Sequence, residues 1–246
     1  MVEVSLDAEK FGSFLRTLSL FRDICNDVEI RSGMVRQRTN DKANIFEMDL
    51  SSLILDSDIL ISNLKQKLDL LKCFLGQEVK IVSNNNEVSF SDQYSIIKFK
   101  NPRVDFIDNK FMSSEEFSSI FSLNEEDLLM DYEIAKTISE RMKVIAQGFN
   151  IVSFQVFFEG DNASITASTS SKDQHAKIVS DIPINQTTNN TFSNLVVTPF
   201  VIDHDGSAVL KMYNISENMC VNKFVTAIGD VNINIFARSQ LMEVTE

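Results

Sequence analysis

The sequence predicts an α+β protein of two similar domains, each combining an antiparallel sheet with helices. Its 246 residues, 43% of them hydrophobic, are enough for two domains of ordinary size. Stretches with the helical period of about 3.6 residues alternate with short strand-like runs that turn residues separate. This order of helix, strands, helix and strands occurs twice, although the two copies share little residue identity. The predicted repeat is therefore one of architecture.

The first predicted domain, residues 1–100, opens with an amphipathic helix over residues 7–24. Phe11 and Phe14 begin a row of apolar residues at the spacing of one helix face. A second helix is expected over residues 62–75, where leucines form a stripe and a Ser or Asn is available as the N-cap. The expected strands are DVEIRS, MVRQRT, NIFEMDLSSLI and then an antiparallel meander of EVKIVS, EVSFSD and YSIIKFK.

Residues 101–118 are predicted to form a connector, because they contain Pro102 and show no clear period. The second predicted domain, residues 119–246, should contain a helix over residues 131–147 and a short helical turn over residues 199–204. Its expected strands are a run around residues 123–129, followed by IVSFQVFFEG, ASITASTS, HAKIVSDIPI, VLKMYNI, KFVTAIG and VNINIFAR.

The cysteines and the N-terminus indicate the cellular compartment. Cys25, Cys73 and Cys220 are odd in number and far apart in sequence, so no disulfide framework is predicted, and buried thiols in a reducing compartment are expected. The N-terminus is acidic where a secretory signal would be basic and then apolar, and the apolar runs are only a few residues long. We expect an intracellular protein without membrane association.

The net charge of −12 would normally argue against nucleic-acid binding, because binding to phosphate depends on Lys and Arg. The distribution of charge favours the opposite conclusion. The three predicted helices contain nine Lys or Arg against seven Asp or Glu, whereas the remainder contains 14 against 28. In the helix over residues 131–147, Lys136, Ser139, Lys143 and Gln147 are expected to lie opposite the apolar side. These lysines either face a ligand or belong to an ordinary solvated face.

Candidate catalytic and metal-binding groups are few. The two histidines, His175 and His204, are 29 positions apart and lack a Cys or acidic cluster at zinc-ligand spacing. The acids Asp56, Asp58 and 125–127 lie among Ser and Asn, where solvated loop acids are expected. No glycine-rich phosphate loop occurs. We therefore predict no metal, no cofactor and no enzymatic activity, and we favour a binding or assembly protein.

Long runs in both halves show a family resemblance. The first half contains SGMVRQRTNDKANIFEMDLSSLILDSDILISNLKQKLDLLKCFL and EVKIVSNNNEVSFSDQYSIIKFKNP, with a Gly-led strand, a D-L-x-x-L strand end and a Leu-periodic helix. The second half contains DYEIAKTISERMKVIAQ and SNLVVTPFVIDHDGSAVLKMYNI. These runs resemble DNA sliding clamps, especially those of T-even-like phages. The likeness covers nearly the whole chain without a strict signature, and the helix expected near Val201 lacks the Lys or Arg of a basic lining.

The resemblance implies a specific assembly and a specific role. Clamps of this kind are two-domain chains that close head to tail as homotrimers, with helices around double-stranded DNA and sheets outside. They are processivity factors that tether a DNA polymerase, they depend on a clamp loader, and they have no catalytic activity. A phage protein of this kind would act in the host cytoplasm or nucleoid.

The resemblance also implies three groups of site residues. The residues facing DNA would be Lys136, Lys143, Arg16, Lys65, Lys72 and Lys10. The subunit contact would pair YSIIKFK of one copy with HAKIVSDI of the next. The alternative is that each of these edges is covered by its own chain. The contact residues would be Tyr94, Ile96, Ile97, Phe99, Lys177, Ile178 and Val179. A groove for a polymerase peptide would be formed by Phe106, Ile107, Phe111, Leu241 and Met242. The alternative is that these residues only hold the connector in place.

Three other interpretations are compatible with the sequence. A processivity factor of the same fold that does not close into a ring would need a stronger basic face, because it must hold DNA by affinity. A structural or scaffold protein would leave the helix lysines merely solvated. A hydrolase would require a pocket around His204.

Overall fold

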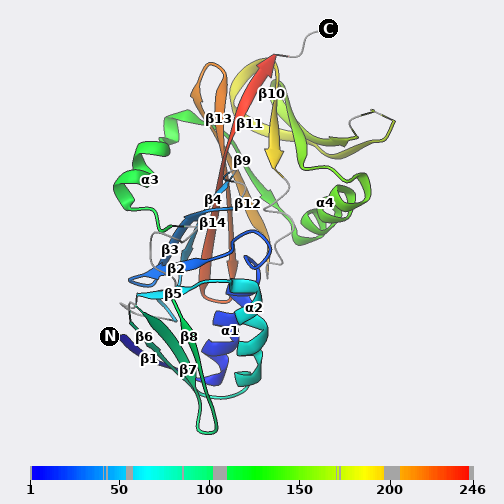
Figure 1. Ribbon diagram of the computed structural model, residues 1–246. Coiled ribbons are helices and arrows are strands. Elements are labelled where there is room, and N and C mark those ends of the chain that lie inside the picture. Colours follow the sequence, from blue (N-terminus) through cyan, green and yellow to red (C-terminus); the bar gives the residue numbers. More distant parts are fainter. Residues whose placement is uncertain are drawn as a thin grey trace. The chain divides into compact units, whose positions relative to one another are not determined.

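The computed structural model describes the whole chain except Met1 and residues 41, 43, 54–57, 85, 102–109, 170, 172, 197–205 and 244–246. The chain divides into two compact units (Figure 1). The first unit comprises Met1–Phe117 with Ile228–Ile233, and the second comprises Ser118–Ala227 with Asn234–Glu246. Both units are built from antiparallel strands and helices, so the α+β class predicted from the sequence is confirmed.

The first unit contains two antiparallel sets of strands and the helices α1 and α2. Its elements are β1 (Val2–Leu6), α1 (Ala8–Ser19), β2 (Val28–Arg31), β3 (Met34–Arg38), β4 (Asn44–Asp49), β5 (Ile59–Ile61), α2 (Leu64–Leu71), the 3₁₀ turn η1 (Lys72–Phe74), β6 (Val79–Ser83), β7 (Glu87–Ser91) and β8 (Ile96–Lys100). The strands follow the orders β5-β2-β3-β4 and β1-β6-β7-β8. The pairing of β6, β7 and β8 confirms the predicted meander, whereas β1 and β5 were not predicted.

Phenylalanine side chains fill the core of the first unit. Phe11 and Phe14 of α1 lie with ring centroids 6.3 Å apart, and Phe74 meets Phe11 edge-on at 6.3 Å. Phe21 stacks on Phe46 of β4 at 4.3 Å. All five are fully buried, so the apolar face of the first predicted helix does pack into the core.

The helices of the first unit are shorter than predicted. α1 begins after Asp7, whose carboxylate accepts the backbone N–H of Lys10 at 2.8 Å, and it ends at Ser19 instead of residue 24. Near that end, the hydroxyls of Thr17 and Ser19 donate to backbone carbonyls one turn earlier, a contact that competes with regular helix geometry. α2 begins at Leu64, and η1 forms its last turn. None of the described helices has the length and hydropathy needed to cross a lipid bilayer.

The chain continues through a helix in the predicted connector and then through the strands of the second unit. These elements are α3 (Ser114–Ile120), the 3₁₀ turn η3 (Glu125–Asp127), β9 (Leu128–Ile134), α4 (Lys136–Phe149), β10 (Ser153–Ser168), β11 (His175–Val196), β12 (Ala208–Ser216), β13 (Met219–Ile228) and β14 (Val231–Glu243). The strands of the second unit follow the order β14-β13-β12-β9, and β11 pairs with both β10 and β14.

The predicted helix over residues 131–147 is wrong at its start. Residues 128–134 form β9, which pairs antiparallel with β12, and Ile134 lies opposite Ala208 in that ladder. The sequence DYEI also alternates polar and larger apolar residues, so pairing with β12 decides in favour of the strand. The helix begins only at Lys136, after Ala135 in an extended conformation.

A long hairpin replaces the three strands predicted between residues 151 and 184. β10 and β11 pair with each other from Ser153 opposite Val196 to Ser168 opposite His175, with register shifts on both sides of Gly160. Gly160 has a φ of 61°, which favours glycine, so the strand bends there without ending. The helical turn predicted over residues 199–204 lies outside the described residues.

The two units repeat one chain path. In the first unit, β1 leads into α1 and pairs with β6, the first strand of the meander β6-β7-β8. In the second unit, β9 leads into α4 and pairs with β12, the first strand of the series β12-β13-β14. Both units therefore share this part of the chain path, whereas the second helix predicted for the second unit, over residues 199–204, lies outside the described residues.

Candidate nucleic-acid interface

Three helices carry a local excess of positive charge. Within the observed bounds of α1, α2 with η1, and α4 there are eight Lys or Arg and three Asp or Glu, a net charge of +5. Because the whole chain has a net charge of −12, the remaining residues carry −17. α3 differs, since its only charged residues are Glu115 and Glu116. The observed bounds thus make the contrast stronger than the predicted bounds did.

In α4, Lys136 and Lys143 lie along one flank. Lys136 is exposed and Lys143 is half-buried, while Met142 and Ala146 face the core. Among the described residues, neither lysine forms an ion pair with an acid. Ser139 was expected on the solvent side with the lysines but is only 3% exposed. The buried stripe is therefore rotated toward Ser139, which leaves Lys143 at its margin.

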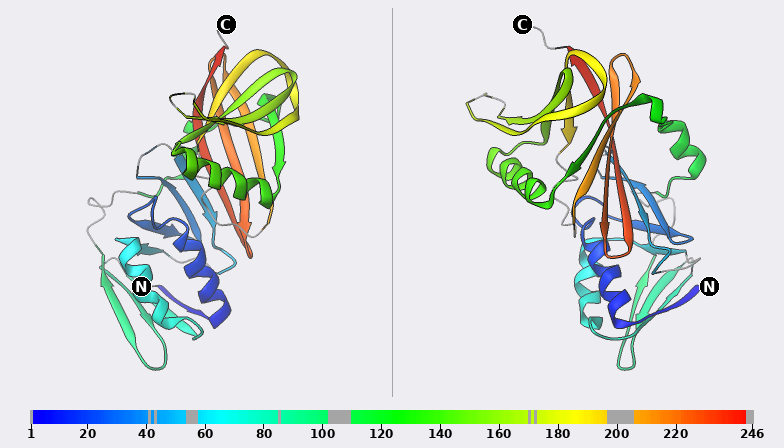
Figure 2. Two further views of the ribbon diagram at one scale, coloured as in Figure 1. Left: turned by 90° about the vertical axis from the view of Figure 1, so that its right-hand side faces the viewer. Right: turned by 180° about the vertical axis from the view of Figure 1, so that it is seen from behind.

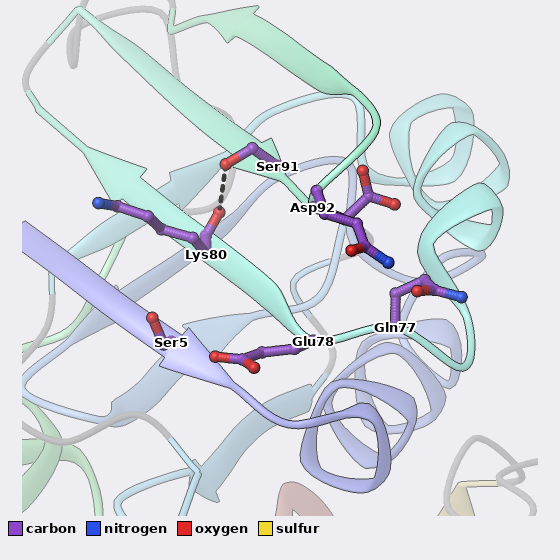
Figure 3. A pocket seen from close by; sticks show the side chains of 7 residues that line it. Ser5, Gln77, Glu78, Lys80, Ser91 and Asp92 are labelled. Atoms are coloured by element: carbon purple, nitrogen blue, oxygen red, sulfur yellow. Dashed lines mark hydrogen bonds between the residues drawn. The ribbon is translucent and has the colours of Figure 1, made fainter.

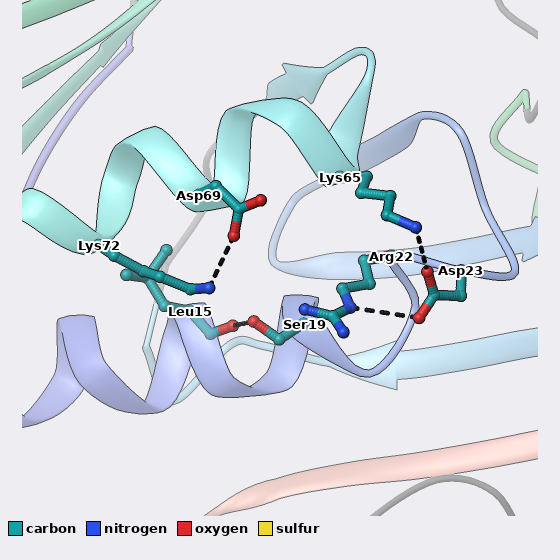
Figure 4. A network of polar contacts seen from close by, with 7 residues as sticks. All are labelled: Leu15, Ser19, Arg22, Asp23, Lys65, Asp69 and Lys72. Carbon is teal, nitrogen blue, oxygen red and sulfur yellow. Dashed lines mark hydrogen bonds and ion pairs between the residues drawn. The ribbon is translucent and has the colours of Figure 1, made fainter.

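Two basic side chains, Lys65 of α2 and Lys72 of η1, pair with exposed acids (Figure 4). Lys65 Nζ lies 3.0 Å from an Asp23 carboxylate oxygen, and Lys72 Nζ lies 2.7 Å from Asp69. Arg22 also contacts Asp23, at 3.2 Å. The hydrogen bonds from Lys65 and Arg22 hold the pKa of Asp23 below its ordinary value. Exposed pairs of this kind contribute only about 0–1 kcal/mol and are screened by salt, so these lysines can exchange their partner for a phosphate.

α1 and α2 lie side by side (Figure 2), and together with η1 they supply four of the six residues predicted to face DNA. Lys10 and Arg16 of α1 are exposed, as are Lys65 and Lys72. Sequence reasoning missed Arg22, which follows α1 and meets the start of α2 at a depression of about 300 Å³ that Asn26, Asn63 and Lys65 also line. Because the helix was predicted to continue to residue 24, Arg22 was assigned to the helix and not to the segment that follows α1.

Lys67 has a structural role within the same helix. It is only 8% exposed, its Nζ donates to Ser62 Oγ at 2.9 Å, and it lies 5.0 Å from the ring centroid of Phe99 in β8. Burial lowers the pKa of Lys67, and the negative charge of Asp27 opposes that shift. Lys67 therefore connects α2 to β8 and does not reach the exposed basic surface.

A second depression of the first unit lies at β1, β6 and β7 (Figure 3). It has a volume of about 490 Å³, and its charged lining residues are Glu78, Lys80 and Asp92. Within the described part of the chain, no group of three His, Cys, Asp or Glu has the arrangement of a metal site. This depression offers mixed charge without convergent catalytic groups.

The two predicted subunit-contact segments lie at strand edges. β8 is the last strand of the order β1-β6-β7-β8, and Tyr94 and Ile96 are 79% and 58% exposed. Ile97 is half-buried, whereas Phe99 is buried and packs 6.0 Å from Phe90. In the described part of β11, residues 175–182 pair only with β10. In this segment the side chain of Lys177 is exposed, and those of Ile178 and Val179 are half-buried.

The predicted partner-groove residues are divided between the two units. Phe106 and Ile107 lie outside the described residues. Phe111 belongs to the first unit, where its backbone N–H donates to Glu29 at 2.9 Å and its ring lies 5.0 Å from the Arg31 guanidinium carbon. Leu241 and Met242 are half-buried on β14, where they pair with β11. Phe111 is thus held by its own unit.

Solved structures show what this arrangement is similar to. A PCNA from A. fulgidus, solved with the C-terminal region of FEN-1 bound, matches 100% of both chains with a TM-score of 0.62 and 13% identity. A PCNA from Entamoeba histolytica matches 96% of this chain and 98% of its own, with a TM-score of 0.61 and 11% identity. This protein has the fold of a DNA sliding clamp. No protein-family model matches the chain, and no curated protein matches it.

The sliding-clamp fold also appears in a longer relative. A putative DNA polymerase III beta subunit from Eubacterium rectale matches 99% of this chain, with a TM-score of 0.62 and 11% identity, but only 66% of its own length. The sliding-clamp fold therefore covers essentially all of this chain, and the predicted architecture is confirmed.

Proposed function

We propose that this protein is a DNA sliding clamp that encircles duplex DNA and acts as a polymerase processivity factor. The observation that carries the proposal is the charge of +5 on α1, α2 with η1, and α4, in a chain of net charge −12 with the sliding-clamp fold. A negatively charged duplex is repelled by the rest of such a surface and attracted to these helices. An encircling ring needs only weak, sequence-independent contacts with phosphates, which allow it to slide.

The proposed ring closes head to tail through strand edges. A closed homo-oligomer of this kind needs two different complementary surfaces on each chain. β8 and residues 175–182 of β11 supply two edges whose backbone groups another strand can complete. Three copies of a two-unit chain would form the homotrimer that the clamp resemblance implies. The non-ring processivity factor is the alternative, and it shares the fold but not this contact.

The proposed partners are a DNA polymerase and a clamp loader. In the A. fulgidus PCNA structure, the C-terminal region of another protein is bound, which supports peptide docking as the mode of recognition for this fold. The acidic remainder of the chain would favour partners with basic surfaces. We propose that the protein has no catalytic activity. An intracellular location and a phage origin of the T-even-like kind complete the proposal. Cys25 and Cys220 are buried free thiols as expected, whereas Cys73 is exposed, so the expectation of a buried thiol is wrong there. Free thiols are compatible with a reducing compartment.

The mass of the protein in solution tests the ring. We expect the parent chain to have the mass of a trimer at micromolar concentration in light scattering. Ile178→Lys, which places a charge in the proposed strand contact, should give monomers with an unchanged circular dichroism spectrum. A monomeric parent would favour the non-ring processivity factor. A trimeric Ile178→Lys variant would show that β11 is not the edge used.

A further inference from the structure

The short helix α3 carries no buried residue. It runs from Ser114 to Ile120, and all of its seven side chains are exposed or half-buried. Isolated helices shorter than about 12–15 residues are marginal in water, because few backbone hydrogen bonds offset the cost of the first turn. Contacts with other parts of the chain therefore keep α3 helical.

A reciprocal pair of hydrogen bonds fixes the start of α3. The Ser113 hydroxyl accepts the backbone N–H of Glu116 at 3.1 Å, and the Glu116 carboxylate accepts the backbone N–H of Ser113 at 2.8 Å. This arrangement is a capping box, which satisfies N–H groups that the helix itself cannot pair. It determines where α3 begins, but a cap of this kind does not by itself stabilise so short a helix.

Arg36 of β3 contacts the first turn of α3 from the sheet. Its neighbours Val35 and Gln37 are fully buried, so the alternation of side chains along β3 places Arg36 on the outer face of the sheet. The guanidinium donates from Nη1 to the Ser114 hydroxyl at 2.9 Å, and its carbon lies 4.9 Å from the ring centroid of Phe117. One arginine therefore contacts both residues by a charge-assisted hydrogen bond and a cation–π contact.

Glu47 of β4 orients this arginine. Arg36 and Glu47 are directly opposite each other in the β3–β4 ladder, and their side chains are only 14% and 17% exposed. Nε and Nη2 of Arg36 lie 2.7 Å and 2.6 Å from the same Glu47 oxygen. Because the guanidinium is planar and rigid, this pairing leaves Nη1 and one flat face for α3.

The chain on either side of this contact is held separately. Before the capping box, Met112 is buried, and its backbone N–H donates to the Arg36 carbonyl at 2.7 Å. After Phe117 the chain belongs to the second unit, in which the Arg238 guanidinium donates to the Ile120 carbonyl. Residues 113–117 therefore follow a buried anchor and meet the outer face of the sheet at Arg36.

We propose that residues 113–117 form a strap that Arg36 fastens to the outer face of the first unit, and that release of this strap unfolds α3. The fastened strap is helical and covers the Arg36–Glu47 ion pair, whereas the released strap is extended and uncovers it. A partner that binds the connector as a helix would favour the fastened state, and a partner that binds it extended would favour release. This device goes beyond the proposed clamp function, because it requires neither a ring nor DNA.

Amide hydrogen exchange of the full chain, followed by mass spectrometry, tests the strap. Arg36→Gln removes the charge and the contact with the Phe117 ring, so amides in residues 114–120 should exchange at least about tenfold faster, while β3 and β4 stay protected. Arg31→Gln is the matched control on the neighbouring strand β2, since Arg31 contacts Glu29 and the Phe111 ring. It should leave exchange in α3 unchanged.

A second substitution tests whether the ring and the guanidinium act as one contact. Phe117→Leu should accelerate exchange in α3 of the parent and add little in the Arg36→Gln background. Equal acceleration in both backgrounds would overturn the shared contact. Unprotected α3 amides in the parent, or unchanged exchange in Arg36→Gln, would refute the strap. Loss of protection in β3 and β4 as well would show that Arg36 supports the sheet instead.

Discussion

Replacement of the two α4 lysines should weaken duplex binding by a predictable amount. Lys136→Glu with Lys143→Glu removes the charges on the exposed flank of α4, and neither side chain contributes to the core. Each phosphate contact contributes about 0.9 to the slope of log K against log salt on B-DNA. Since Lys136 is exposed and Lys143 half-buried, the slope should fall by about 0.9 if only Lys136 contacts phosphate and by about 1.8 if both do.

These slopes convert into an affinity loss. The electrostatic contribution becomes small near 1 M salt, so at about 0.1 M salt the loss should be roughly 8-fold for one contact and roughly 60-fold for two. Fluorescence anisotropy with a labelled duplex over a salt series measures both quantities. Lys80→Glu with Lys110→Glu is the control, because it changes the net charge equally at exposed positions outside the three helices. An unchanged slope, or an equal loss in the control, would refute a DNA-facing role for α4.

Three further changes test neighbouring parts of the account. Asp23→Asn should release Lys65 and Arg22 and steepen the salt slope of duplex binding by up to about 0.9, and a weaker or unchanged slope would exclude them from the DNA surface. Phe99→Ala should lower the free energy of unfolding by about 3–5 kcal/mol in urea titrations, because a buried ring is lost; a loss below about 1 kcal/mol would contradict the packing. Burial lowers the pKa of Lys67 from its ordinary value of 10.5. Between the native pKa and 10.5, the unfolded chain therefore binds more protons than the native chain. As pH rises through that window, the free energy of unfolding of the parent should increase relative to that of Lys67→Met. A pH-independent difference would show that Lys67 is not desolvated.

Much of the fold followed from local sequence patterns. The meander of β6, β7 and β8 was predictable because turn residues separate three strand-like runs, and α1 because Phe11 and Phe14 lie on one face. The errors occurred where tertiary pairing overrides local pattern. Residues 131–134 form the end of β9 because β12 pairs with them, and three predicted strands became one hairpin because Gly160 permits a bend within β10.

The candidate DNA surface was only partly predictable. Spacing along a helix placed Lys136 and Lys143 off the apolar stripe, and their contact with DNA stays a prediction. Spacing could not separate Lys67 from Lys65, since the burial of Lys67 depends on Phe99, more than thirty residues later in the sequence. The position of Arg22 depended on where α1 ends, and the pairing of Lys65 with Asp23 joins two segments far apart in the chain. Such contacts follow from the fold and not from periodicity.

Topological capture on DNA tests the central claim most directly and needs no clamp loader. The protein is mixed with linear duplex DNA that carries biotin at both ends, streptavidin is then added to block the ends, and retention is measured after a wash at about 1 M salt, where phosphate contacts contribute little. If the protein is an encircling ring, protein added before streptavidin should remain on the DNA after the wash. Protein added after streptavidin should not be retained on the DNA. Equal retention in both orders of addition, or loss in both, would contradict a closed ring around DNA.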